Sequence, residues 1–315
     1  MADTFTQRYA LVTGANKGIG FEICRQLASK GIVVILASRD EKRGLEARER
    51  LLKESRSISD GDVVFHQLDV VDPASVVVVA DFIKTKFGRL DILVNNAGVS
   101  GVEIEGDISV FQEYAEANLN IIAAKGAQAH PFHPKTNGKM IETLKDAKEC
   151  IETNYYGTKR ITEALIPLLQ KSDSPTIVNV SSALSTLLLQ PNEWAKGVFS
   201  SEDSSLNEEK VEEVLHEFHK DFIDGKLQQN NWPPNFAAYK VSKEAVNAYT
   251  RIIARKYPSF CINSVCPGFV RTDICYSLGQ LSEAEGAEAP VKLALLPRGG
   301  PSGSFFFREE ALSLY

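Results

Sequence analysis

Two residues four positions apart, Tyr239 and Lys243, could together move a proton to or from a substrate oxygen. A spacing of four places both side chains on one face of a helix, with the lysine ammonium beside the tyrosine phenol. A phenol of ordinary pKa near 10 is a slow acid or base at neutral pH, and a neighbouring cation favours the phenolate. Lowering that pKa to about 7 would require about 4 kcal/mol of differential stabilisation. The alternative is an ordinary exposed helix pair, which this spacing alone does not exclude.

A glycine-rich turn near the amino end could bind a diphosphate. It reads Thr13-Gly14-Ala15-Asn16-Lys17-Gly18-Ile19-Gly20, between a short apolar strand and a segment with apolar residues at helical spacing. Glycines permit a close backbone approach, and the following helix N-terminus offers unpaired N–H groups and a positive dipole end. Loops with three glycines are common, but this position between strand and helix indicates a dinucleotide site.

Basic residues at the end of the second predicted strand indicate which dinucleotide binds. A carboxylate there would accept a hydrogen bond from the adenosine ribose and repel a 2′-phosphate. The chain instead has Ser38 and Arg39, followed by Lys42 and Arg43. Guanidinium groups match phosphate in bidentate geometry, and we assign the discordant Asp40 to capping the next helix. These residues predict NADP(H) rather than NAD(H), with a solvated helix face as the alternative.

Apolar runs of strand length alternate with helical segments along the chain. The predicted strands are 10–12, 33–37, 63–68, 91–94, 176–180 and 262–265. Strands that are apolar throughout and separated by helices form a parallel sheet covered on both faces. We therefore predict an α/β fold with a doubly wound parallel sheet of the Rossmann type.

One segment carries conflicting signals. Val76–Val79 is β-branched and favours a strand by local preference. Asp72 and Pro73 just before it are the N-cap acid and first-position proline of a helix. The length to Phe87 suits a crossover helix, so we predict a helix there.

The 315 residues amount to about two average domains, but we predict one Rossmann-type domain over 1–315. Two stretches exceed what the sheet needs, at about 100–145 and 183–235, and we interpret both as insertions. The second contains a predicted helix, in which Ser205 and Glu208 form a capping-box pattern.

The composition excludes several classes of protein. With 43% hydrophobic and 24% charged residues and a mean hydropathy of -0.14, the chain is not a disordered tail, a fibre or a disulfide-dense module. A net charge of -6 gives no general attraction to nucleic acid or anionic lipid. The sequence has no signal-peptide pattern or membrane-length apolar stretch. Its five cysteines include no CxxC pair, so we expect a cytoplasmic protein with buried, reduced thiols.

Ordered motifs over about residues 9–275 resemble the short-chain dehydrogenase/reductase family. They are the glycine turn, Asn95-Asn96-Ala97-Gly98, Asn154 within 153–157, Ser181-Ser182, Tyr239-x-x-x-Lys243 and Pro267-Gly268. The resemblance implies a catalytic tetrad of Asn154, Ser182, Tyr239 and Lys243, in which Ser182 bonds the carbonyl oxygen and Asn154 holds a water. Adjacent strand residues point to opposite faces, and the family usually uses the second serine, which favours Ser182 over Ser181. The implied cofactor contacts are Gly14, Asn16, Lys17, Gly18, Ile19, Gly20, Ser38, Arg39, Arg43, Asp69, Val70, Asn96, Lys243, Pro267, Gly268 and Thr272.

The spacing of the motifs indicates which branch of the family the chain resembles. Residues 183–238, 56 in all, lie between Ser182 and Tyr239, far more than in most of the family. This insertion resembles the carbonyl-reductase branch, in which added helices cover the surface used elsewhere for dimerisation, so we expect a monomer. The whole chain is similar to plant monoterpene ketone reductases, which implies reversible, NADPH-dependent conversion of menthone to menthol or neomenthol. A member of that group that reduces a conjugated C=C bond has glutamate in the position of Tyr239, so the tyrosine here favours carbonyl reduction.

Three other functions stay open: an enone C=C reductase, an alkaloid ketone reductase, and a non-catalytic NADP-binding regulator. Regulators on this fold usually lose the tyrosine or the lysine, and this chain has both. The sequence departs from the monoterpene ketone reductases at 99–101 and 118–126. Both stretches could line the pocket, so the product stereochemistry stays open.

Apolar residues are expected to enclose a cyclic ketone, because its affinity comes mainly from apolar burial. We expect walls from Val99 onward, Ala183-Leu184, 187–189 and Trp194, although the leucines could equally anchor the inserted helices. His216 and His219 lack a third ligand, so we expect no metal site.

Overall fold

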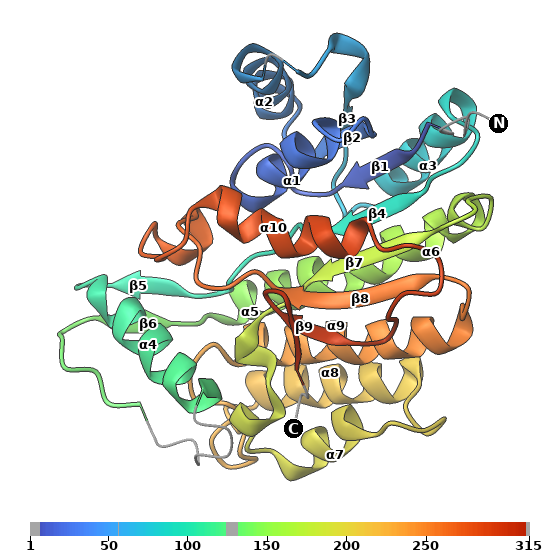
Figure 1. Ribbon diagram of the computed structural model, residues 1–315. Coiled ribbons are helices and arrows are strands. Elements are labelled where there is room, and N and C mark those ends of the chain that lie inside the picture. Colours follow the sequence, from blue (N-terminus) through green and yellow to red (C-terminus); the bar gives the residue numbers. More distant parts are fainter. Residues whose placement is uncertain (1–6, 56, 124–131, 313–315) are drawn as a thin grey trace.

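A computed structural model of the chain describes residues 7–55, 57–123 and 132–312, with only the backbone described in 119–123. Its centre is an eight-stranded sheet of order β10-β9-β8-β7-β4-β1-β2-β3, parallel except for the β9–β10 hairpin (Figure 1). The strands are β1 (Tyr9–Val12), β2 (Val33–Ser38), β3 (Val63–Gln67), β4 (Ile92–Asn95), β7 (Thr176–Val180), β8 (Cys261–Cys266), β9 (Phe305–Phe307) and β10 (Glu310–Leu312). The strand order reverses between β1 and β4, which leaves a crevice at the carboxyl edge. The doubly wound fold and the six predicted strands are confirmed, and β9 and β10 extend the sheet beyond them.

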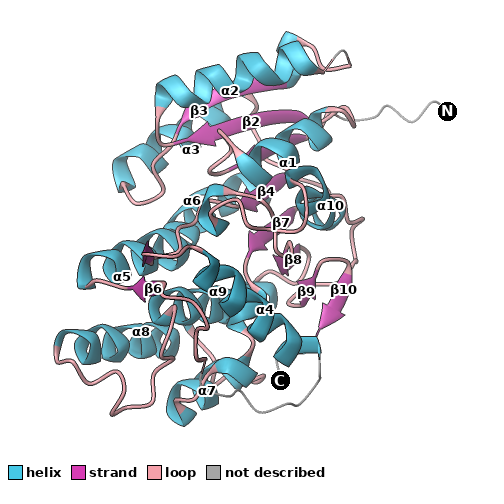
Figure 2. Cartoon of the chain, turned by 90° about the vertical axis from the view of Figure 1, so that its left-hand side faces the viewer, coloured by secondary structure: helices cyan, strands magenta, loops and turns pink. Residues whose placement is uncertain are grey.

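Helices cover both faces of the sheet (Figure 2). Side chains alternate along each strand, so that Ala10 and Val12 pack into one core cluster and Leu11 into the other. The first cluster is covered by α1 (Gly18–Ala28), α2 (Glu41–Glu54) and α10 (Glu283–Ala294). The second is covered by α3 (Pro73–Lys86), α5 (Leu144–Ile151), α6 (Thr158–Leu169) and α9 (Ala237–Lys256). Single turns of 3-10 helix are η1 (Asp60–Asp62), η3 (Ala183–Ser185), η4 (Leu187–Leu189) and η5 (Asp273–Cys275), and η2 (Glu152–Gly157) is a π-helical turn.

The valine-rich segment is helical, as predicted. Asp72 caps α3 by accepting a hydrogen bond from the Ala74 N–H, and Pro73 is the first helical residue. Val76 and Val79 are buried, whereas Val77 and Val78 lie on the exposed face. The capping signals and the length therefore outweigh the local β-preference.

The two expected insertions have different structures. The first holds β5 (Glu103–Glu105), α4 (Ser109–Ala123) and β6 (Lys139–Ile141), with β5 and β6 paired antiparallel. The second holds α7 (Glu193–Ser200) and α8 (Glu208–Ile223), and α8 packs on α9 (Figure 1). The prediction of a capping box at Ser205 and Glu208 is wrong. Helix α8 begins at Glu208 and its N-cap is Asn207, whose side chain accepts a hydrogen bond from the Lys210 N–H.

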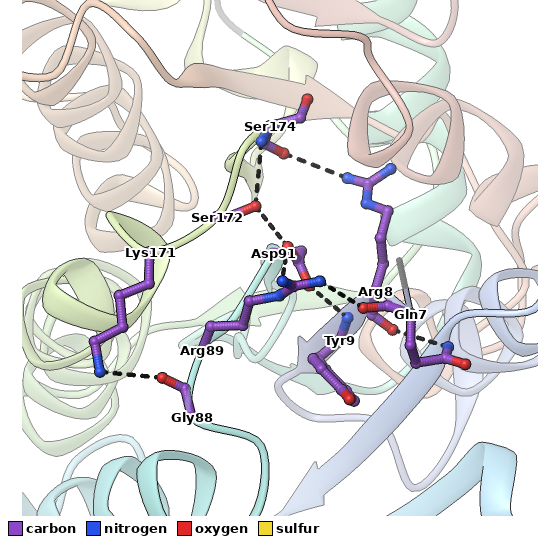
Figure 3. Close-up of polar contacts among 9 residues, drawn as sticks. All are labelled: Gln7, Arg8, Tyr9, Gly88, Arg89, Asp91, Lys171, Ser172 and Ser174. Atoms are coloured by element: carbon purple, nitrogen blue, oxygen red, sulfur yellow. Dashed lines mark hydrogen bonds and ion pairs between the residues drawn. The ribbon is translucent and has the colours of Figure 1, made fainter. Parts of the chain in front are cut away.

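A polar network joins the strands at the opposite, amino edge of the sheet (Figure 3). The buried Asp91 carboxylate accepts hydrogen bonds from the Tyr9 N–H at 2.8 Å and the Ser172 hydroxyl at 2.5 Å. Arg89 lies 3.4 Å from the same carboxylate and donates to the Gln7 carbonyl. Asp91 thus ties the start of β1 to β4 and to the loop before β7, far along the strands from the carboxyl edge.

Candidate active site

A cleft of about 610 Å³ lies where β1, β2, β4, β7 and β8 end. Most of the predicted site residues line it, although they come from segments far apart in the chain. These are Gly14, Asn16, Lys17, Gly18, Ile19, Gly20, Arg39, Arg43, Asp69, Val70, Asn96, Ser182, Tyr239, Lys243, Pro267, Gly268 and Thr272. Ser38 and Asn154 do not line it.

The glycine turn lies against the loop after β4. Gly14 has a φ of 63°, and a Cβ on it would sit 2.8 Å from the Cα of Ala97. A Cβ on Gly20 would sit 2.4 Å from the Asn96 Nδ2, which itself donates to the Thr13 carbonyl at 2.9 Å. Lys17 is the N-cap of α1 but makes no side-chain cap hydrogen bond. Gly18, Ile19 and Gly20, the first residues of α1, line the cleft, and no side chain in the described part of the chain caps their N–H groups, as a diphosphate site requires.

The end of β2 has the predicted positive charge. Arg39 and Arg43 are exposed and line the cleft. Asp40 caps α2 as predicted, accepting from the Arg43 N–H at 2.9 Å, and its carboxylate lies 3.8 Å from the Arg43 Nε. Ser38 differs from its predicted role, because its buried hydroxyl donates to the Asp40 carbonyl behind the cleft.

The loop after β8 closes the other side of the glycine turn. Lys17 forms an ion pair with Asp273. Thr272 approaches the turn closely, since its Cγ2 would lie 3.3 Å from a Cβ on Gly18. Uncapped N–H groups, glycines at the close approaches and two cleft-facing guanidinium groups form a donor set that fits a phosphorylated dinucleotide.

Tyr239 and Lys243 lie in the first two turns of α9, on the face toward the cleft. The Lys243 Nζ is 5.8 Å from the centre of the Tyr239 ring and donates to the Val180 carbonyl at 2.8 Å. Burial lowers the pKa of Lys243 to about 8. Burial also raises the pKa of Tyr239, while a hydrogen bond with the Ser182 side chain acts to lower it. Ser181, by contrast, donates toward the Lys243 carbonyl at 3.4 Å.

Asn154 lies behind these residues, fully buried in the π-helical turn η2. Its Oδ1 accepts from the Val99 N–H at 2.9 Å, and its Nδ2 donates to the Val99 carbonyl at 3.0 Å and to the Ser242 hydroxyl at 3.0 Å. A Cβ on Gly98 would lie 3.1 Å from the Asn154 Oδ1 and 3.4 Å from the Lys243 Nζ. Asn154 therefore holds the loop after β4 beside Lys243, and its part in a water chain stays a prediction. π-helical turns often occur at functional sites.

An aromatic chamber extends the cleft beyond Tyr239. Phe111 and Tyr114 from α4 pack with Phe236, which precedes α9, at ring-centre distances of 5.6 and 5.1 Å. Phe269 lies 6.0 Å from Phe111. All four line the cleft, as do Val99, Ala183 and Leu184 of the expected walls. Phe236 lies three residues before Tyr239, and Phe269 directly follows Pro267-Gly268, a signal that could have located them in the sequence.

Other expected wall residues lie elsewhere. Leu187 and Leu189 are buried away from the cleft, and Leu187 packs in the core with Ala195 and Phe199 of α7. Trp194 is 43% exposed on α7. This part of the prediction is wrong, because the leucines anchor the inserted helices. Residues 124–126 of the stretch 118–126 lie outside the described residues.

Within the part of the chain that the structure describes, the other reactive side chains do not gather into a metal centre. Cys24, Cys150, Cys261 and Cys266 are free and buried, and Cys275 is free and half-buried. Cys266 and Cys275 line the cleft. Among the residues that the structure describes, no group of three or more His, Cys, Asp or Glu side chains could hold a metal ion. Within the same residues, no helix is both long and apolar enough to cross a membrane.

Comparison with known proteins places this geometry in context. Residues 8–190 match the family described as short chain dehydrogenase. The chain is 65% identical over 312 residues to (-)-isopiperitenone reductase of Mentha piperita, covering 98% of this chain and 99% of the relative. It is 54% identical over 308 residues to (+)-neomenthol dehydrogenase of Capsicum annuum, covering 98% of both. The solved structure of menthone neomenthol reductase from Mentha piperita is similar with a TM-score of 0.88 at 67% identity, covering 97% of this chain and 100% of that one.

Proposed function

Because the chain belongs to the short-chain dehydrogenase family, we propose that it is an NADPH-dependent reductase of a cyclic monoterpene ketone, converting menthone reversibly to menthol or neomenthol. It is an oxidoreductase of this family and fits its monoterpene reductase branch. The observation that carries the proposal is the position of Tyr239. Its phenol lies beside the Ser182 side chain where the glycine-lined part of the cleft meets the aromatic chamber.

The chain's own residues supply proton transfer and orientation. Bound NADPH would supply a hydride to the carbonyl carbon. Burial keeps the Tyr239 phenol protonated, so it can donate its proton as negative charge develops on the substrate oxygen. Ser182 lies beside that phenol and can donate a hydrogen bond to the same oxygen. Lys243, anchored on the Val180 carbonyl, holds a positive charge beside the phenolate that remains.

The cofactor preference is supported by Arg39 and Arg43. Both guanidinium groups line the cleft at the end of β2, where a 2′-phosphate would lie. Asp40, the one carboxylate between them, is engaged as the N-cap of α2. A phosphate therefore meets two cations there and a carboxylate that is already hydrogen-bonded.

The substrate class is supported by the aromatic chamber. A cyclic ketone has one polar atom, so enclosure of its ring must provide most of the binding free energy, at about 25 cal/mol per Å² of apolar surface. Phe111, Phe236 and Phe269 supply such surface beside the Tyr239 phenol. An alkaloid ketone is the bulkier alternative for the same chamber.

A second candidate is the reduction of a conjugated C=C bond. The relative at 65% identity is named (-)-isopiperitenone reductase, a name that does not state which bond is reduced. Reducing an enone would convert it to a saturated ketone, whereas the proposed reaction gives an alcohol. A phenol beside a serine hydroxyl suits protonation of an oxygen, so we favour the alcohol.

Substituting Tyr239→Phe tests the proposal. We expect turnover of menthone to fall about 10²- to 10⁴-fold while NADPH affinity stays within about twofold, because only the proton donor is lost. Tyr257→Phe at the other end of α9 is the matched control. Unchanged turnover in Tyr239→Phe would remove the mechanism, and tight NADPH binding without turnover in the wild type would favour a regulator.

The monomeric state is also part of the proposal. Helix α8 packs on α9, and Lys159 of α6 holds it through ion pairs of 2.7 Å to Glu208 and 2.6 Å to Glu212. These contacts lay α8 over α9, as expected if the insertion covers a surface that would otherwise be available for assembly. Light scattering should give the mass of one chain, and a stable dimer or tetramer would contradict the proposal.

A further inference from the structure

The amino end of the catalytic helix α9 lacks a cap of its own. Its N-cap residue is Phe236, whose side chain has no hydrogen-bond acceptor and whose backbone is left-handed, with a φ of 53°. Phe236, Ala237 and Ala238 are all buried, so the first N–H groups of the helix cannot turn to water. Buried N–H groups without an acceptor are costly, and an acceptor must come from elsewhere in the chain.

Glu142 supplies both acceptors from about a hundred residues earlier in the chain. Its Oε2 accepts from the Ala237 N–H at 3.1 Å and its Oε1 from the Ala238 N–H at 2.8 Å. Glu142 follows β6, at the end of the first inserted segment. A carboxylate at this position also interacts favourably with the positive end of the helix dipole.

The residue that follows the two capped amides is Tyr239. Its carbonyl accepts from the Ser242 hydroxyl at 2.8 Å, and that hydroxyl accepts from the Asn154 Nδ2 at 3.0 Å. The first turn of α9 is thus held by Glu142 at its start and by Ser242 and Asn154 one turn later. The phenol projects from the backbone between these two points.

The same inserted segment also touches this turn through Tyr114. Its hydroxyl donates to the Asn235 carbonyl at 3.3 Å, and its ring lies 5.5 Å from the Lys240 Nζ. Tyr114 forms part of the aromatic chamber, so the chamber wall and the proton donor share one set of attachments to α9. Glu142 is the attachment that reaches the helix end directly, through hydrogen bonds from two backbone N–H groups.

We infer that Glu142 is a positioning residue, which fixes the first turn of α9 and thereby directs the Tyr239 phenol at the substrate oxygen. The expected effect on kcat rests on the proposed function. The contacts from which the inference is drawn do not depend on it. Glu142 is not one of the residues that line the cleft, and its hydrogen bonds to α9 go to the Ala237 and Ala238 amides. Its effect should therefore fall on turnover more than on binding.

Three variants separate this role from simple stabilisation. Glu142→Ala removes both acceptors, Glu142→Gln keeps one amide oxygen as an acceptor, and Glu149→Ala removes an exposed carboxylate of the nearby α5 as the control. For each we would measure kcat and KM with menthone, the NADPH Kd by fluorescence, and Tm. Displacing a catalytic group by about an ångström lowers the rate up to about 100-fold.

We expect Glu142→Ala to lower kcat about 10- to 100-fold with the NADPH Kd within about twofold, Glu142→Gln to recover part of the loss, and Glu149→Ala to match the wild type. A kcat within twofold of the wild type in Glu142→Ala would overturn the inference. So would a loss of kcat in parallel with NADPH affinity and Tm, which marks a purely structural residue. If Glu142→Ala does not fold, Glu142→Gln becomes the deciding variant. An unchanged kcat in Glu142→Gln would then overturn the inference.

A readout independent of turnover keeps the two proposals distinct. In protein labelled with fluorotyrosine, the ¹⁹F resonance of Tyr239 is identified by its loss in Tyr239→Phe. We expect that resonance to move in Glu142→Gln and to stay in place in Glu149→Ala. An unchanged chemical shift of Tyr239 in Glu142→Gln would refute the positioning role. A wild-type protein that does not reduce menthone would refute only the proposed function.

Discussion

Removing the guanidinium group of Arg39 should weaken the binding of NADPH while leaving NADH nearly unaffected. Arg39 is exposed at the end of β2 and lines the cleft beside Asp40 and Arg43. A charge-assisted hydrogen bond contributes about 1.5–3 kcal/mol, which corresponds to about a 10- to 100-fold change in KM for Arg39→Ala. Arg43 lies 3.8 Å from the Asp40 carboxylate, which already offsets part of its charge. We therefore expect a smaller effect for Arg43→Ala, about 3- to 10-fold.

The assay compares kcat/KM for NADPH and NADH in each variant at two salt concentrations. NADPH binding should also weaken with added salt in the wild type, and less so in Arg39→Ala, because screening acts on the phosphate contact. Lys53→Ala removes an exposed cation near the other end of α2 and serves as the control. An equal loss for both cofactors, or no loss for NADPH, would refute a 2′-phosphate site at Arg39.

Further consequences concern the proton donor, the chamber and the fold. Gly98→Ala should lower kcat about tenfold, because the added Cβ would lie 3.1 Å from the Asn154 Oδ1 and 3.4 Å from the Lys243 Nζ; an unchanged kcat would show that this packing is not needed. Burial lowers the pKa of Lys243 to about 8, so its ammonium is charged below that pH and neutral above it. Ketone reduction should accordingly slow as the pH rises through about 8, and a rate that stays level to pH 10 would exclude a role for that charge. Phe111→Ala should raise the KM for menthone about tenfold without changing the Kd for NADPH, as steady-state kinetics and cofactor titration would reveal. Asp91→Ala breaks a buried charged network and should lower the free energy of unfolding, measured in urea, by about 3 kcal/mol. The kcat per folded molecule should stay unchanged.

The sheet and the cofactor side of the cleft could be predicted because their signals are local. Each element of that side directly follows a strand: the glycine turn, Arg39 and Pro267-Gly268 lie within a few residues of β1, β2 and β8. In a doubly wound sheet the strand ends meet at one edge, so neighbours in space follow from the strand order. Ser38 departs from the prediction because its side chain turns inward beneath α2.

The chamber could not be predicted in the same way. Phe111 and Tyr114 belong to α4, which reaches the site by long-range packing of an inserted segment. Leu187 and Trp194 show the reverse error, since apolar character does not tell whether a side chain faces the cleft, the core or solvent. Glu142 was also beyond sequence reasoning, because its partners on α9 are about a hundred residues away. The strand β9 is a run of three phenylalanines, too short to distinguish from a core loop.

Incubating the purified protein with NADPH and menthone, and resolving the products by chiral gas chromatography, addresses the function itself. We expect consumption of one NADPH for each alcohol formed, with menthol or neomenthol as the product, and loss of that product in Tyr239→Phe. Consumption of NADPH only with an enone, to give a saturated ketone, would contradict carbonyl reduction by Tyr239.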